Sequence, residues 1–261
     1  MTRQLTLLAT WLIIAVIAPQ APAALLAVDV NERTADVDGP PGPDTPAGFE
    51  SFVINTAGNS GVTTATQTLP SGYTVTFDLF DDGNANDGGA AGNQAGAFDD
   101  RDRISPDTAP TLNQLYDDFI FAGASAGPAG GIDVKISGGA LLPLTNYLVS
   151  IYAYDGISST GASATPVRTA TYVDGNNADA PVLTTVFTTN IRPAADETYK
   201  FTGIARTDAA GQLFLKGRRA TAADVSVYIN GLEVSAIPEP ASLTLTVLGM
   251  ASLLMARRRR G

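Results

Sequence analysis

The sequence predicts an all-β protein, an antiparallel β-sandwich of about ten strands. Two observations support this prediction. Short segments alternate apolar and polar residues with a period of two, and Gly, Pro, Asn and Asp separate them. The segments are also rich in Thr, Val, Tyr and Phe, the residues that favour a pleated, half-buried sheet. With 261 residues, of which 44% are hydrophobic, the chain can bury the core of one domain, which we place at residues 24–236.

Four alternating segments define the sandwich most clearly. Tyr73, Val75, Phe77 and Leu79 share one face of the first, and threonines share the other. The other three place the following residues on one face: Ile132, Val134 and Ile136; Tyr147, Val149 and Ile151; Val225, Val227 and Ile229. Further strands are expected at Glu50–Asn55, Asp118–Ala122, Arg168–Val173, Val182–Thr188, Thr198–Ala205 and Gln212–Lys216.

One stretch of the body has helical rather than β spacing. Leu112, Leu115, Tyr116 and Phe119 follow Pro110 at intervals of three and four, which predicts one or two helical turns before the next strand. Two longer apolar segments lie at the ends of the chain. They predict an N-terminal signal helix and a C-terminal transmembrane helix outside the sandwich.

The composition excludes several classes of function. The formal net charge is −10, so the surface repels nucleic acid and anionic headgroups, and we expect no nucleic-acid partner. The chain has no cysteine, which rules out disulfides and thiolate chemistry. It has no histidine either, which removes the Ser-His-Asp triad and nearly all zinc sites.

Residues 1–23 have the pattern of a secretory signal peptide. Arg3 supplies the positive charge, Leu5 to Ala18 are mostly apolar, and Ala21-Pro22-Ala23 is a small-residue cleavage site. A permanent N-terminal anchor is the alternative. We expect export, with the mature chain starting near Ala24.

Residues 237–261 form a tripartite tail. An apolar span at 241–256 would reach about 24 Å as a helix, and a C-terminal basic cluster would stay in the cytoplasm. The motif before the span is Pro238, Glu239 and Pro240, and the cluster is Arg257, Arg258, Arg259 and Arg260. This combination resembles a PEP-CTERM sorting signal. The resemblance implies processing by an exosortase, a membrane protease, from an inner-membrane precursor in a polysaccharide-producing bacterium. An unprocessed tail anchor is the alternative.

The body resembles the galactose-binding-like jelly rolls of exported bacterial proteins. The resemblance rests on LTNYLVSIYAYD at 144–155, ATYVDG at 170–175, GQLFLKG at 211–217 and VSVYINGLEVS at 225–235. It implies a fold shared with carbohydrate-binding modules. A fold alone does not determine a function.

An acidic, glycine-rich segment at 81–103 is the candidate metal site. Ca²⁺ prefers six to eight oxygen ligands, and Asp81, Asp82, Asn84, Asn86 and Asp87 offer oxygens at short spacing. The order is not that of an EF-hand, because Asp87 and Asn93 stand where glycine and glutamate are required. A metal-free loop of Asx turns fits the same residues. The neighbouring Asp99–Arg103 fits either a local salt-bridge network or a ligand-binding cleft.

The candidate ligand site combines tyrosines with polar side chains. Sugar sites pair an aromatic face with hydrogen-bonding groups, and the residues expected here are Tyr152, Tyr154, Asp155, Arg168, Tyr172 and Asn176. The alternative is that these tyrosines cover a half-buried sheet face. The only tryptophan, Trp11, lies in the signal segment, which removes the best platform for stacking a glycan from the mature chain.

The sequence favours a non-catalytic surface or extracellular-matrix protein that associates with exopolysaccharide. No H-E-x-x-H or phosphate-binding loop is present, and without histidine no Ser-His-Asp triad can form, so we do not expect an enzyme. A secreted polysaccharide hydrolase is the rival interpretation, since such an enzyme needs only two suitably spaced carboxylates.

Overall fold

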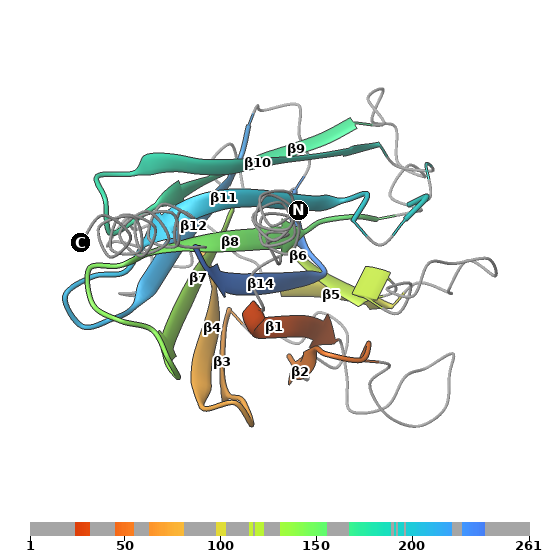
Figure 1. The fold of residues 1–261 in the computed structure, drawn as a ribbon. Helices are drawn as coiled ribbons and strands as arrows, with labels where there is room; N and C mark the ends of the chain where they lie inside the picture. The colour runs from red at the N-terminus through yellow and green to blue at the C-terminus, as the bar shows by residue number, and fades with distance from the viewer. Residues whose placement is uncertain are drawn as a thin grey trace, which may run out of the picture. The chain divides into compact units, whose positions relative to one another are not determined.

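The body of the protein is built almost entirely from antiparallel β-strands, as the sequence predicts (Figure 1). In this computed structural model the described residues are 24–31, 45–54, 63–80, 98–102, 115–116, 118–122, 131–155, 167–188, 191, 193–195, 197–220 and 226–237. Residues Ala24–Ala236 form one compact unit. The signal segment and the sorting motif with its span lie outside the described residues, among which no helix is long and apolar enough to cross a membrane.

The described residues contain fourteen strands. Their bounds are β1 Ala24–Asn31, β2 Glu50–Val53, β3 Thr64–Thr68, β4 Tyr73–Leu79, β5 Phe98–Asp102, β6 Asp118–Ala122, β7 Gly131–Gly138, β8 Asn146–Tyr152, β9 Val167–Asp174, β10 Ala180–Thr188, β11 Lys200–Arg206, β12 Leu213–Arg219, β13 Val227–Ile229 and β14 Gly231–Ala236. They form three sheets, in the orders β11-β8-β14-β1-β2, β10-β9-β12-β7-β4-β3 and β13-β6-β5. The pairing of β1 with β2 is parallel, and the other pairings are antiparallel.

The five-stranded and six-stranded sheets enclose a common apolar core. The period-two pattern directs Val75 and Phe77 of β4 and Val134 of β7 inward from the six-stranded sheet. Val149 of β8 and Val234 of β14 face inward from the five-stranded sheet. The edge strands β10 and β11 approach closely, so the sandwich is closed along that side.

Four strands differ from the sequence-based prediction. The strands β1, β3 and β5 were not expected as such, and β5 occupies most of Asp99–Arg103, which was interpreted as a salt-bridged loop or cleft. The strand expected around Val227 and Ile229 is β13, and the separate strand β14 that follows directly after Asn230 was not expected: β13 pairs with β6 whereas β14 pairs with β8 and β1. Asn230 is fully buried at this junction, where its Oδ1 accepts a hydrogen bond from the Tyr154 backbone N–H at 2.6 Å.

The expected helix between 112 and 119 is described only as a single turn at Leu115 and Tyr116. Leu115 packs against Gly231 of β14, where a Cβ would lie 2.6 Å from Leu115 Cδ1. Tyr116 contacts the Tyr152 ring edge-on, with 6.2 Å between ring centroids. The turn therefore covers one end of the outer face of the five-stranded sheet.

Candidate functional site

The six residues of the expected ligand site are not gathered on one exposed surface. Tyr152, Tyr154, Asp155, Arg168 and Tyr172 are all at most 4% exposed, whereas Asn176 is exposed in the turn after β9. No exposed aromatic face is therefore formed at these positions.

Tyr152 lies on the outer side of the five-stranded sheet beneath a polar cluster. Its hydroxyl donates to Glu233 Oε1 at 2.8 Å, and Lys200 Nζ lies 5.5 Å from the ring centroid and 2.8 Å from Glu233 Oε2. Burial, reinforced by Glu233, raises the pKa of the Tyr152 hydroxyl far above its usual range. For Lys200 burial acts in the lowering direction, but Glu233 and Glu197 outweigh it and raise the pKa.

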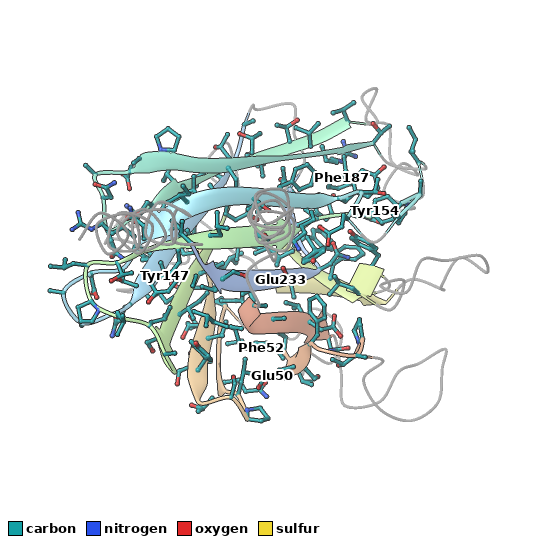
Figure 2. The ribbon with its side chains drawn as sticks, viewed as in Figure 1. Glu50, Phe52, Tyr147, Tyr154, Phe187 and Glu233 are labelled. Atoms are coloured by element: carbon teal, nitrogen blue, oxygen red, sulfur yellow. The ribbon has the colours of Figure 1, made fainter. Side chains whose placement is uncertain are left out.

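Tyr154 belongs to an aromatic cluster at the other end of the sandwich from Asn176. Its ring stacks on Tyr199 with 4.8 Å between centroids. It also contacts the ring of Phe187 edge-on, with 5.9 Å between centroids, and Figure 2 shows these two side chains near each other. Arg168 pairs with Phe187 across β9 and β10, so Arg168 lies at this same end. Burial raises the pKa of Tyr172, whose side chain lies in the core between the sheets.

Asn176 joins the two sheets through hydrogen bonds of its side-chain amide. Its Nδ2 donates to the carbonyl oxygens of Gln212 at 2.7 Å and Arg206 at 3.2 Å. The neighbouring carboxylate of Asp174 accepts from the backbone N–H groups of Arg206 and Asn176. These bonds connect β9 of one sheet with β11 of the other.

The expected calcium ligands Asp81, Asp82, Asn84, Asn86 and Asp87 lie outside the described residues. In the part of the chain that is described, no three acidic side chains are grouped in a way that could hold a metal ion.

The outer face of the six-stranded sheet carries an aromatic side chain between two cations. Phe214 of β12 is half-buried, and its ring centroid lies 5.1 Å from Lys135 Nζ and 5.6 Å from Lys216 Nζ. The sequence contains three lysines, so two of them flank this ring. Gly175 leaves space for the ring, since a Cβ there would lie 2.4 Å from Phe214 Cδ1.

Threonines extend this surface across the sheet. Thr66, Thr76, Lys135 and Phe214 are cross-strand partners on β3, β4, β7 and β12, so their side chains form one row. With strands about 4.8 Å apart, this row is about 14 Å long. The hydroxyls of Thr66 and Thr76 are 2.9 Å apart. We call the surface formed by Thr66, Thr76, Lys135, Phe214 and Lys216 the Phe214 face.

A second row on the same side of the sheet contains two buried carboxylates. Asp78 and Asp133 are directly opposite each other on β4 and β7, and they are 1% and 0% exposed. Arg218 donates a hydrogen bond to the Asp133 carboxylate. Its guanidinium stacks on the Phe80 ring, with 3.5 Å between Arg218 Cζ and the ring centroid. Burial raises the pKa of the Asp133 carboxyl, and Arg218 offsets this only in part.

Sequence reasoning missed the Phe214 face although a signal was present. Leu213 and Leu215 occupy the buried positions of β12, so Phe214 falls at a position where an outward polar residue is expected. Phe214 is thus an aromatic residue at a solvent-facing position, and Lys216, two positions later, lies on the same face of the strand. This pattern indicates such a surface. The alignment of Lys135 beside it depends on strand pairing that the local sequence does not contain.

The chain matches no known protein family, and no curated protein is significantly similar to it. Among solved structures it is similar to the arabinose-bound MgGH51 α-L-arabinofuranosidase, with 10% identity and a TM-score of 0.30 over 84% of this chain and 31% of the other. It is also similar to a glycoside hydrolase family 43 arabinoxylan arabinofuranohydrolase from Bacillus subtilis, solved in complex with cellotetraose. That match has 8% identity and a TM-score of 0.28 over 80% of this chain and 44% of the other. The chain thus spans less than half the length of both proteins.

Proposed function

We propose that this protein is an exported, non-catalytic component of the bacterial cell surface or extracellular matrix, and that its body associates with exopolysaccharide. Residues 1–23 direct export, and the tail is recognised and cleaved by an exosortase-type protease after a transient inner-membrane stage. The body belongs to the jelly-roll class of sandwich. The sequence supports the sorting route through Pro238-Glu239-Pro240, the apolar span and the terminal arginines.

The observation that carries the binding function is the position of Phe214 between two lysines. An aromatic ring can stack on the apolar side of a sugar, while ammonium and hydroxyl groups hydrogen-bond to its oxygens. The Phe214 face presents these groups in a row about 14 Å long, which suits a chain of sugars better than a single small molecule.

A binding experiment tests this function. The mature chain is titrated with polygalacturonate, which carries carboxylates, and with neutral dextran, each with Ca²⁺ and with a chelator. Phe214→Ala should weaken binding about tenfold or more, because burying a phenylalanine side chain contributes about 1.5–3 kcal/mol. Val186→Ala is the matched control, since Val186 is a 46% exposed apolar side chain on the outer side of β10. Equal affinities of the two variants for the polysaccharide would contradict the proposal. If binding is lost only when Ca²⁺ is chelated, the polysaccharide binds at a calcium-dependent site instead.

The buried state of the opposed carboxylates favours a non-catalytic role over the rival hydrolase. Catalytic carboxylates must reach the scissile bond, whereas Asp78 and Asp133 are enclosed and Arg218 is paired with Asp133. We expect the mature chain to release no reducing sugar from the polysaccharide that it binds. Release that is abolished by Asp133→Asn, in a variant that still binds, would establish the hydrolase instead.

Mass spectrometry of the mature C-terminus tests the sorting proposal. Cleavage near Pro238-Glu239-Pro240 is expected in a cell that contains an exosortase. An intact Arg257–Gly261 end would favour the unprocessed tail-anchored alternative.

A further inference from the structure

The loop between β7 and β8 presents two leucines to solvent at one end of the sandwich. Leu142 and Leu144 are 61% and 58% exposed, and Pro143 between them is exposed as well. We call Leu142, Pro143 and Leu144 the leucine tip. Residues 139–146 carry no charge although the chain as a whole is strongly acidic.

The leucine tip is held in a fixed shape by hydrogen bonds. The Leu142 backbone N–H donates to the Tyr147 hydroxyl at 2.8 Å, and the Leu142 carbonyl accepts from Thr207 Oγ1 at 2.6 Å. The Leu144 N–H donates to the Asp208 carbonyl at 3.0 Å, and Arg206 Nε donates to the Leu144 carbonyl at 3.2 Å. A flexible surface loop would not need such bonds, so the exposure of both leucines is built into the fold.

Leu144 adopts a backbone conformation that is unfavourable for leucine. Its φ is +52°, in the left-handed region that Gly and Asn occupy far more readily. An exposed leucine at this position loses stability without gaining any packing. Backbone strain of this kind is typical of functional positions.

The chain enters and leaves the body at the same end as the leucine tip. The last residue of β14, Ala236, is paired with Tyr147 at the start of β8, directly after the tip. The first residue of β1, Ala24, is paired with Ser235. Both apolar terminal segments of the sequence are therefore attached to this end of the sandwich.

The linker to the apolar span is short. Four residues, 237–240, separate the end of β14 from the span that begins at Ala241. Fully extended, they reach at most about 14 Å. When the span is inserted, this end of the body must lie within that distance of the membrane.

We infer that the leucine tip is a membrane-contacting surface of the precursor. With the span inserted, Leu142 and Leu144 enter the boundary between headgroups and acyl chains and hold Pro238-Glu239-Pro240 at the bilayer surface. The inference rests on the proposed sorting tail. The inserted tail keeps the leucine tip at a high effective concentration beside the bilayer. Two leucines therefore suffice for contact, although the tip by itself has no independent affinity for the membrane. A protein interface would need about 20–30 residues on each side, so a bilayer fits this small tip better.

Tryptophan fluorescence of the full chain in vesicles tests the inference. The background is Trp11→Phe, which leaves the chain without tryptophan, in vesicles of phosphatidylethanolamine and phosphatidylglycerol with brominated acyl chains. Leu142→Trp should show blue-shifted emission and at least threefold stronger quenching than Val186→Trp. Val186 is the control because it lies toward the other end of the sandwich, where Phe187 pairs with Arg168 near the start of β9.

Two further variants keep the test decisive. Leu248→Trp reports insertion of the tail by itself. If Leu248→Trp is quenched and Leu142→Trp is not, the inference about the leucine tip fails while the assignment of the tail survives. If Leu248→Trp is not quenched, both the inference and the tail assignment fail.

Adding Leu144→Asn to Leu142→Trp should reduce the quenching at least twofold without lowering the unfolding temperature, because asparagine tolerates the positive φ. A blue shift that depends on protein concentration in the absence of lipid would assign the tip to contact between two copies, and would overturn the inference.

Discussion

Tyr152 and its neighbours determine how the protein responds to alkaline pH. The pKa values of Tyr152, Tyr172 and Lys200 are all raised in the folded protein. Above about pH 10 the unfolded chain therefore loses protons that the folded chain retains, and stability decreases as pH rises. Below that pH these groups contribute their full stabilisation.

We predict that Tyr152→Phe makes this alkaline loss less steep. Each fully affected group contributes about 1.4 kcal/mol per pH unit, so the variant should lose stability more slowly than the wild type between pH 10 and 12. At pH 7 it should be about 1 kcal/mol less stable, because the hydrogen bond to Glu233 is lost. Urea unfolding across this pH range measures both effects. An unchanged slope would show that the Tyr152 hydroxyl ionises in the folded protein as readily as in the unfolded chain.

Leu144 provides a second prediction for a single residue. Leu144→Asn should unfold at the same temperature as the wild type or a higher one, since it relieves the positive φ and removes an exposed apolar side chain. Differential scanning calorimetry measures the change. A clear decrease in unfolding temperature would mean that the leucine side chain stabilises the body itself, which would remove the basis for a role in membrane contact.

At the scale of the elements, the close approach of the edge strands β10 and β11 depends on one glycine. A Cβ on Gly203 of β11 would lie 2.0 Å from the Val182 carbonyl oxygen of β10. Gly203→Ala should therefore destabilise the protein by about 3 kcal/mol, at the upper end of the cost of overpacking. Ile204→Ala, at a 52% exposed neighbouring position, should change the stability by less than about 0.5 kcal/mol. Chemical denaturation of both variants distinguishes this close contact from a general sensitivity of β11.

The elements also show what local sequence could predict. Alternation predicted β4, β7 and β8, because in each strand one face packs into the core and the other faces outward. It did not predict that Leu115 and Tyr116 would cover the outer side of β8 and β14. Tyr152 therefore appeared to be an outward-facing aromatic, whereas it is buried. The separate strand β14 was missed for a similar reason, since only distant partners assign β13 and β14 to different sheets.

At the scale of the whole molecule, two surfaces have different proposed roles. The Phe214 face lies on the outer side of the six-stranded sheet and is proposed to bind polysaccharide. The leucine tip lies at the end of the sandwich where the chain enters and leaves, and is proposed to contact the membrane before processing. Because the two surfaces share no residue, Phe214→Ala should leave vesicle quenching unchanged and Leu144→Asn should leave polysaccharide affinity unchanged.

The central claim is that the body binds polysaccharide through the Phe214 face. Its most direct test is an NMR titration of the isotope-labelled mature chain with short oligomers of whichever polysaccharide binds. The account predicts shifts of the backbone amides of Thr66, Thr76, Lys135, Phe214 and Lys216, and none of the amides around Tyr154. Shifts confined to the surroundings of Tyr154, or no shift from a folded chain with any polysaccharide tested, would contradict it.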